Sequence, residues 1–144
     1  LEYIDADGTK KTPIMIHCAL VGSIERFLSI YLEHTAGWLP MWCAPENVRI
    51  LTVNDQIPEY VNNVTSILEE IALDEPLPNN KLRYIVDDSA DSLGKKIRRA
   101  TNMKIPCIII VGPKDAENSE VSVRLRDREE KVALDELVEF IKGI

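Results

Sequence analysis

The sequence feature that most limits the fold is the run Cys107-Ile-Ile-Ile-Val111, which Pro106 and Gly112 bound. It is far shorter than the roughly 18 apolar residues that a membrane helix needs. A short, unbroken apolar run between turn-forming residues is typical of a strand that is buried inside a sheet. We therefore expect the chain to build a sheet around this strand.

Strands and helices alternate on both sides of this run. We expect strands at 48–53, 82–86 and 121–125, helices at 57–73, 92–102 and 134–141, and a loop at 74–80. This alternation implies right-handed crossovers and a largely parallel sheet, with an antiparallel hairpin added late. Residues 47–144 thus suffice for one α/β domain, with a small mixed, largely parallel sheet and flanking helices.

Residues 1–46 do not suffice for a domain of their own. A hairpin turn is expected at Asp5–Gly8, a strand over 13–21, and a helix that begins after Ser23 and stops at Gly37. Two strands and one helix cannot bury their own apolar faces, so we interpret residues 1–46 as the tail of an upstream domain. The chain opens on leucine rather than methionine, and we expect it to be a piece of a longer protein.

Charge is distributed unevenly along the chain. Residues 1–80 carry 4 basic and 12 acidic side chains, and residues 81–144 carry 13 basic and 12 acidic ones. The net charge of −7 disfavours non-specific binding of nucleic acid, because phosphate binding is mostly electrostatic. The basic second part still permits specific binding of RNA.

The cysteines and the N-terminus indicate the compartment. Cys18, Cys43 and Cys107 are odd in number and form no CxxC motif, which argues against a disulfide framework. No signal peptide or membrane span is visible. We expect a cytoplasmic protein in a reducing compartment, with no membrane partner.

The stretch Pro13-Ile-Met-Ile-His-Cys-Ala-Leu-Val-Gly-Ser-Ile-Glu-Arg-Phe27 resembles the third signature motif of class II aminoacyl-tRNA synthetases. More narrowly, it resembles the threonyl-tRNA synthetase family. The likeness continues through Leu32-Glu-His34, Gly94-Lys-Lys-Ile-Arg98 and Val121-Ser-Val-Arg124 and covers nearly the whole chain.

The resemblance implies that residues 1–46 end an antiparallel catalytic domain and that residues 47–144 form an anticodon-binding domain. It implies a parent enzyme, a homodimer, that attaches threonine to its tRNA through an aminoacyl-adenylate, with ATP and magnesium as substrate. The present chain, which lacks the first two class II motifs, is then inactive alone.

For the adenylate step, the resemblance gives a catalytic role to Arg26 and places Gly22, Ser23 and Arg26 against ATP and substrate. The residue types suit this role, because glycine lets a nucleotide approach the backbone and a guanidinium is always charged. Ser23 would lie near the threonine side chain. The alternative is an ordinary helix start, with Ser23 as N-cap and Arg26 solvated.

For the metal, the resemblance makes His17 one of three zinc ligands, with a Cys and a second His upstream. Zinc with three protein ligands keeps an open position, which threonine fills with its amino and hydroxyl groups. Valine lacks the hydroxyl and is rejected. Cys18 is a poor second ligand, since neighbouring strand residues point to opposite faces, and it departs from the arginine common in the family at that point.

For the anticodon, the resemblance implies that Asp115 accepts a hydrogen bond from a base and that Arg124 reads a base edge. The family has a third anticodon contact, usually an asparagine, and this position is Ala90 here. Either Ser89 takes its place, or the anticodon is read more loosely or in a different way. Three basic side chains share one face of the 92–102 helix and are candidate phosphate contacts, namely Lys95, Arg98 and Arg99. A solvated helix face is the alternative.

Two other functions stay open. One is another class II synthetase with the same anticodon domain, of the prolyl, histidyl or glycyl type, against which the Ile-His-Cys-Ala segment argues. The other is a non-catalytic RNA-binding or subunit-interaction module that keeps the fold.

Overall fold

The computed structural model describes residues 1–54, 56–71 and 81–144. Their contacts divide the chain into two compact units, Leu1–His34 and Thr35–Ile144. The predicted functional boundary between residues 46 and 47 stays a prediction. In the described ranges, no helix has the length and apolar content that a membrane span requires.

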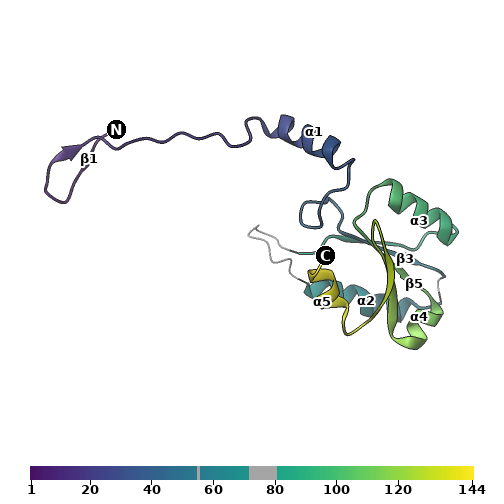
Figure 1. Ribbon diagram of the computed structural model, residues 1–144. Helices are drawn as coiled ribbons and strands as arrows, with labels where there is room; N and C mark the ends of the chain where they lie inside the picture. The colour runs from purple at the N-terminus through teal and green to yellow at the C-terminus, as the bar shows by residue number, and fades with distance from the viewer. Residues whose placement is uncertain (55, 72–80) are drawn as a thin grey trace. The chain divides into compact units, whose positions relative to one another are not determined.

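The larger unit is a five-stranded sheet with helices on both faces (Figure 1). Its strands are β3 (Val48–Thr52), β4 (Tyr84–Asp87), β5 (Cys107–Val111), β6 (Glu120–Arg124) and β7 (Glu129–Ala133). Its helices are α2 (Pro58–Glu70), α3 (Leu93–Asn102), α4 (Pro113–Asn118) and α5 (Leu137–Lys142). This confirms the predicted α/β class. The loop expected at 74–80 lies outside the described residues.

The strand order is β4-β3-β5-β6-β7. β3 pairs in parallel with β4 and β5, whereas β6 pairs antiparallel with β5 and β7. The sheet is therefore mixed, with the parallel strands at one side and the late hairpin at the other. The carboxyl ends of β3, β4 and β5 meet at one edge, where ligands of open α/β sheets commonly bind.

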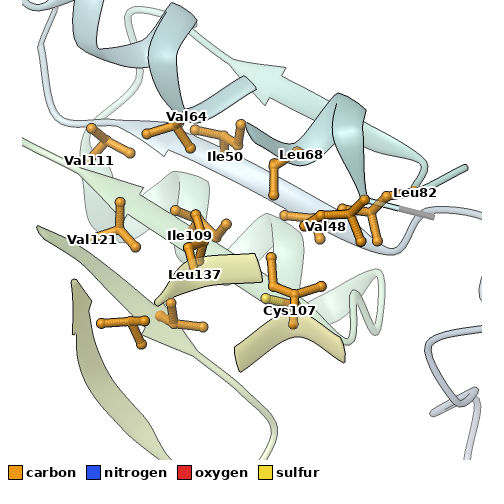
Figure 2. Packing of buried hydrophobic residues seen from close by; sticks show 14 of the residues in the cluster. Val48, Ile50, Val64, Leu68, Leu82, Cys107, Ile109, Val111, Val121 and Leu137 are labelled. Atoms are coloured by element: carbon orange, nitrogen blue, oxygen red, sulfur yellow. The ribbon is translucent and has the colours of Figure 1, made fainter. Parts of the chain in front are cut away.

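Both faces of the central strands are covered, as the apolar run at 107–111 predicts, and β3 and β5 are buried along their whole length. On one face, Val48, Ile50 and Ile109 pack with side chains of α2 and α5, among them Leu68 and Leu137 (Figure 2). Full burial of each such side chain stabilises by about 1.5–3 kcal/mol.

The opposite face packs against α3. Leu51 of β3 and Ile108 and Ile110 of β5 form a second cluster with Ala100. Cys107 belongs to the first cluster, and its burial raises the pKa of the thiol to about 12. It is therefore an inert core residue, as expected from its place in the apolar run.

The segment 35–46, which begins the larger unit, contacts the rest of that unit through the Trp38 ring. Lys104 lies over this ring with its Nζ 5.1 Å from the centroid, and the Arg126 guanidinium carbon lies 5.5 Å from it. Cation–π contacts of this kind contribute about 0.5–1 kcal/mol each at exposed sites.

Buried amide hydrogen bonds bind the same segment. The Asn47 side chain is fully buried, donates to the carbonyls of Met41 and Ala44, and accepts from the Arg83 N–H at 2.6 Å. The Arg83 guanidinium donates to the carbonyls of Trp42, Ala44 and Pro45. Residues 35–46 thus belong to the folded unit that carries the sheet.

The smaller unit holds a hairpin of β1 (Tyr3–Ile4) and β2 (Lys10–Lys11) and the helix α1 (Ile24–His34). The hairpin turn and the helix are confirmed. The strand predicted over 13–21 is wrong, since the segment is exposed and has no strand structure. A strand needs a neighbour to bond its backbone, and among the described residues this segment has no strand partner.

Candidate nucleic-acid interface

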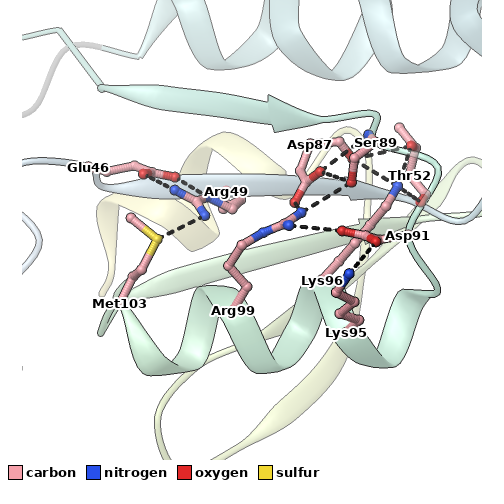
Figure 3. A network of polar contacts seen from close by, with 10 residues as sticks. All are labelled: Glu46, Arg49, Thr52, Asp87, Ser89, Asp91, Lys95, Lys96, Arg99 and Met103. Atoms are coloured by element: carbon pink, nitrogen blue, oxygen red, sulfur yellow. Dashed lines mark hydrogen bonds and ion pairs between the residues drawn. The ribbon is translucent and has the colours of Figure 1, made fainter.

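The carboxyl edge of the parallel strands carries a network of polar side chains from α3, from the end of β4 and from the segment between them (Figure 3). Arg99 donates to Asp87 Oδ2 at 2.5 Å through Nη2 and to Asp91 Oδ2 at 2.9 Å through Nη1. Ser89 Oγ donates to Asp87 Oδ1 at 2.7 Å and accepts from Arg99 at 3.1 Å. The network fixes the segment that follows β4 against α3.

Asp87 is the most perturbed carboxylate of this network. Burial raises its pKa, but the hydrogen bonds from Arg99 and Ser89 outweigh burial and lower the pKa to about 2. Its side chain is 10% exposed. Asp87 is therefore a charged anchor at neutral pH and is not placed to act as a general acid or base there.

The three basic residues of the predicted phosphate-binding face have different surroundings. Arg99 is held by two carboxylates, and Lys95 is 67% exposed and pairs with Asp91 at 2.6 Å. Arg98 is exposed, and its side chain makes no hydrogen bond or ion pair with other residues that the structure describes. Lys95 and Arg98 are thus the two side chains of this set that remain accessible to a phosphate.

A groove of about 440 Å³ opens at the same edge. Thr52, Val86 and Asp88 line it from the strand ends, and residues of α2, including Val61 and Asn62, line the other side. The groove places open space beside the segment that carries Ser89 and Ala90.

Asp115 lies in the first turn of α4, directly after β5. Its Oδ2 accepts from the Gly112 N–H at 2.9 Å, and its Oδ1 accepts from Ser122 Oγ at 3.3 Å. Lys131 Nζ lies 3.8 Å from Oδ1. The carboxylate is therefore held in place by the backbone and by β6, while both oxygens keep lone pairs for a further donor.

Arg124 lies at the end of β6 and is 43% exposed, with Nη1 3.6 Å from a Glu129 carboxylate oxygen. In the antiparallel register, Arg124 is paired with Ile108 and Ser122 with Ile110. Because directly paired residues point to the same face, Arg124 and Ser122 lie on the sheet face that packs against α3. Asp115 contacts the Ser122 side chain, and Arg124 lies two residues after Ser122 in β6. The two residues that are predicted to contact bases, Asp115 and Arg124, therefore lie on either side of Ser122.

The predicted catalytic residues lie in the smaller unit. Ser23 Oγ accepts from the Arg26 N–H at 3.3 Å, as an N-cap does, and donates to Glu25 at 2.6 Å, which lowers the pKa of that carboxyl. Gly22 has a φ of +65°, which favours glycine. Arg26 is exposed and lines a groove of about 430 Å³ together with His34 and neighbouring apolar residues.

His17 and Cys18 are both exposed. Within the described ranges, no group of three or more His, Cys, Asp or Glu side chains is placed to hold a metal ion. The residues present therefore do not by themselves form a zinc site, and His17 stays a predicted single ligand.

Lys96 is a residue of this edge that the sequence did not single out. It is 2% exposed, and its Nζ donates to the carbonyls of Thr52 and Asp87. A signal was available, because Lys96 falls on the inward stripe of the helix, three residues after Leu93 and four before Ala100. A charge at such a position indicates a buried polar contact.

A model of the anticodon binding domain family matches residues 47–144. The threonine–tRNA ligase catalytic subunit of Sulfurisphaera tokodaii is 45% identical over 130 residues, 90% of this chain and 22% of the relative. The threonine–tRNA ligase of Gloeobacter violaceus is 43% identical over 131 residues, 91% of this chain and 20% of the relative. The chain thus spans about a fifth of these relatives.

Solved structures show the same likeness. The RNA binding domain of threonyl-tRNA synthetase from Cryptosporidium parvum superposes with a TM-score of 0.72 at 28% identity, over 87% of this chain and 30% of that one. Prolyl-tRNA synthetase from the same organism shares the fold, with a TM-score of 0.71 at 20% identity over 99% of this chain and 29% of that one. Because the family model matches more than half of this chain, the chain belongs to the anticodon binding domain family, and it is similar in sequence to threonine–tRNA ligases.

Proposed function

We propose that this chain is the anticodon-reading part of a threonine–tRNA ligase, which joins threonine to its tRNA through an aminoacyl-adenylate. The observation that carries the proposal is the family match over 47–144 together with the likeness to threonine–tRNA ligases over nine-tenths of the chain. In the whole protein, the first unit would supply Arg26 to the adenylate step, with ATP and magnesium as substrate.

In this proposal, base reading and phosphate binding fall to different residues. Asp115 and Arg124 flank Ser122 on one sheet face, where an acceptor and a donor fork can meet the edge of an unstacked base. Lys95 and Arg98 lie on α3 with accessible charges that suit phosphates. Ser89 lies in the Asp87 network, so it would read a base only through its remaining lone pair.

We propose a zinc ion only for the whole protein and not for this chain by itself. His17 would supply one ligand, and the other two would come from residues outside this chain. The bound zinc would hold the amino and hydroxyl groups of threonine. The homodimer is proposed in the same way.

The test is binding of tRNA to the whole protein at several salt concentrations, with the threonine anticodon and with altered anticodons. Arg124→Ala should weaken binding of the matched tRNA by about 1–3 kcal/mol and reduce the preference for its anticodon. Lys95→Ala and Arg98→Ala should weaken all tRNAs about equally and lower the salt slope by about one each.

The matched control is Arg128→Ala, in the same hairpin, where Arg128 pairs with Glu130 and lies over Phe140. It should leave the anticodon preference unchanged. If Arg124→Ala also leaves that preference intact, Arg124 does not read the anticodon. If the unaltered protein binds no tRNA even at low salt, the chain is an interaction module that keeps the fold.

A further inference from the structure

We infer that Lys96 is a positioning residue for anticodon reading, which ties the ends of β3 and β4 together and thereby fixes the segment 88–91. The inference rests on the proposed function. It concerns a residue that touches no RNA and acts through the backbone it holds.

All three protons of the Lys96 ammonium group have acceptors at the strand ends. Nζ lies 2.9 Å from the Thr52 carbonyl, 3.1 Å from the Asp87 carbonyl and 3.3 Å from Thr52 Oγ1. All three acceptors are neutral, and no carboxylate among the described residues forms an ion pair with Lys96. Removing an ammonium group from water is costly, and an apolar side chain of similar length would fill this space at less cost. Packing alone therefore does not account for a lysine here.

The place of these bonds explains what the lysine does. The parallel register of β3 and β4 ends at the pair Leu51 and Asp87. The ladder ends at that pair, and the Thr52 hydroxyl and the Lys96 ammonium continue the connection by donating to the Asp87 carbonyl. Lys96 thus connects β3 and β4 beyond the last paired residues of the two strands.

Asp87 is held from α3 at two points. Lys96 holds its main-chain carbonyl, and Arg99 holds its side chain while also reaching Ser89 and Asp91. The segment 88–91 therefore leaves the sheet from a residue whose backbone and side chain are both fixed. This segment contains Ser89 and Ala90, the positions at which the family's third anticodon contact is expected. Loss of the Lys96 bonds would let the segment take more than one arrangement.

The test compares Lys96→Met with Lys95→Met in the whole protein, by tRNA binding with matched and altered anticodons over a range of salt. The two changes remove the same charge from neighbouring positions, one buried and one exposed. Lys96→Met should lower the ratio of matched to altered affinity about tenfold, the effect of one lost hydrogen-bonded contact, and leave the salt slope unchanged. Lys95→Met should lower the slope by about one. It should leave the ratio unchanged, because Arg99 still binds Asp91 when the exposed pair between Lys95 and Asp91 is lost.

Lys96→Gln serves as a second variant, since its amide still donates two hydrogen bonds, and it should restore part of the ratio. The inference is overturned if both Lys96 variants fold and keep the ratio, if they weaken matched and altered tRNAs equally, or if the salt slope falls by one. It is overturned as well if neither variant folds, because Lys96 is then a residue of the folding core. Failure of the proposed function is a different result, in which the unaltered protein does not discriminate between anticodons.

Discussion

The Asp87 carboxylate should make the stability of the larger unit depend on acid in a defined window. The hydrogen bonds from Arg99 and Ser89 hold its folded pKa at about 2, against an ordinary value of 3.8. Each pKa unit corresponds to about 1.4 kcal/mol. Ionised Asp87 therefore stabilises the folded state by about 2 kcal/mol relative to the protonated form.

The direction follows from the lowered pKa. A group whose pKa is depressed by folding contributes its full stabilisation above the unfolded value, near pH 4, and loses it as the pH falls toward about 2. Asp87→Asn keeps the size of the side chain and removes the charge. It should lower the free energy of unfolding by about 2 kcal/mol at pH 7, and this deficit should disappear as the pH approaches 2.

The assay is urea unfolding of the unaltered chain and of Asp87→Asn from pH 7 down to pH 2.5. The other carboxylates titrate in both proteins, so the difference between the two curves isolates Asp87. Asp88→Asn, the same change at the exposed neighbour, should shift the free energy of unfolding at pH 7 by less than about 0.5 kcal/mol. A difference between the unaltered chain and Asp87→Asn that stays constant with pH would refute the reasoning.

Two further outcomes test other parts of the chain. Asn47→Ala leaves the Arg83 N–H and the Met41 carbonyl without their buried partner, and it should lower the free energy of unfolding in urea by about 2–3 kcal/mol, whereas Asn63→Ala on the exposed side of α2 should have almost no effect. In the whole protein, Arg26→Ala should slow threonine-dependent ATP–pyrophosphate exchange on the order of 10²–10³-fold while tRNA binding is kept; unchanged exchange would remove Arg26 from the active site.

Apolar patterning predicted most of the sheet, and the elements it missed are held by polar contacts. β3 and β5 were predictable because their apolar runs are buried on both faces. α4 was not, since its six residues have no apolar period; it begins at Pro113 and is held by the bond from the Gly112 N–H to Asp115. The run at 13–21 is apolar enough for a strand, but pairing also requires a neighbouring strand, which a local pattern does not report.

The sequence predicted the residue types of the candidate site, but it predicted only some of the contacts that their side chains make. The basic run on α3 was visible, but its division into accessible charges at Lys95 and Arg98 and held charges at Lys96 and Arg99 depends on which strand ends α3 meets. Asp87 received no role from the sequence, because its anchoring function arises from Arg99, twelve residues further along.

The attachment of residues 35–46 to the sheet limits which stretch of this chain a gene exchange can transfer with its contacts intact. A gene exchange that transferred only the stretch matched by the family model would begin at Asn47. Its amide and the Arg83 guanidinium would then lack the carbonyls they bind, and Lys104 and Arg126 would lack the Trp38 ring. A transferable unit that keeps these contacts therefore starts no later than Trp38, so recombination points that survive selection should fall before that residue.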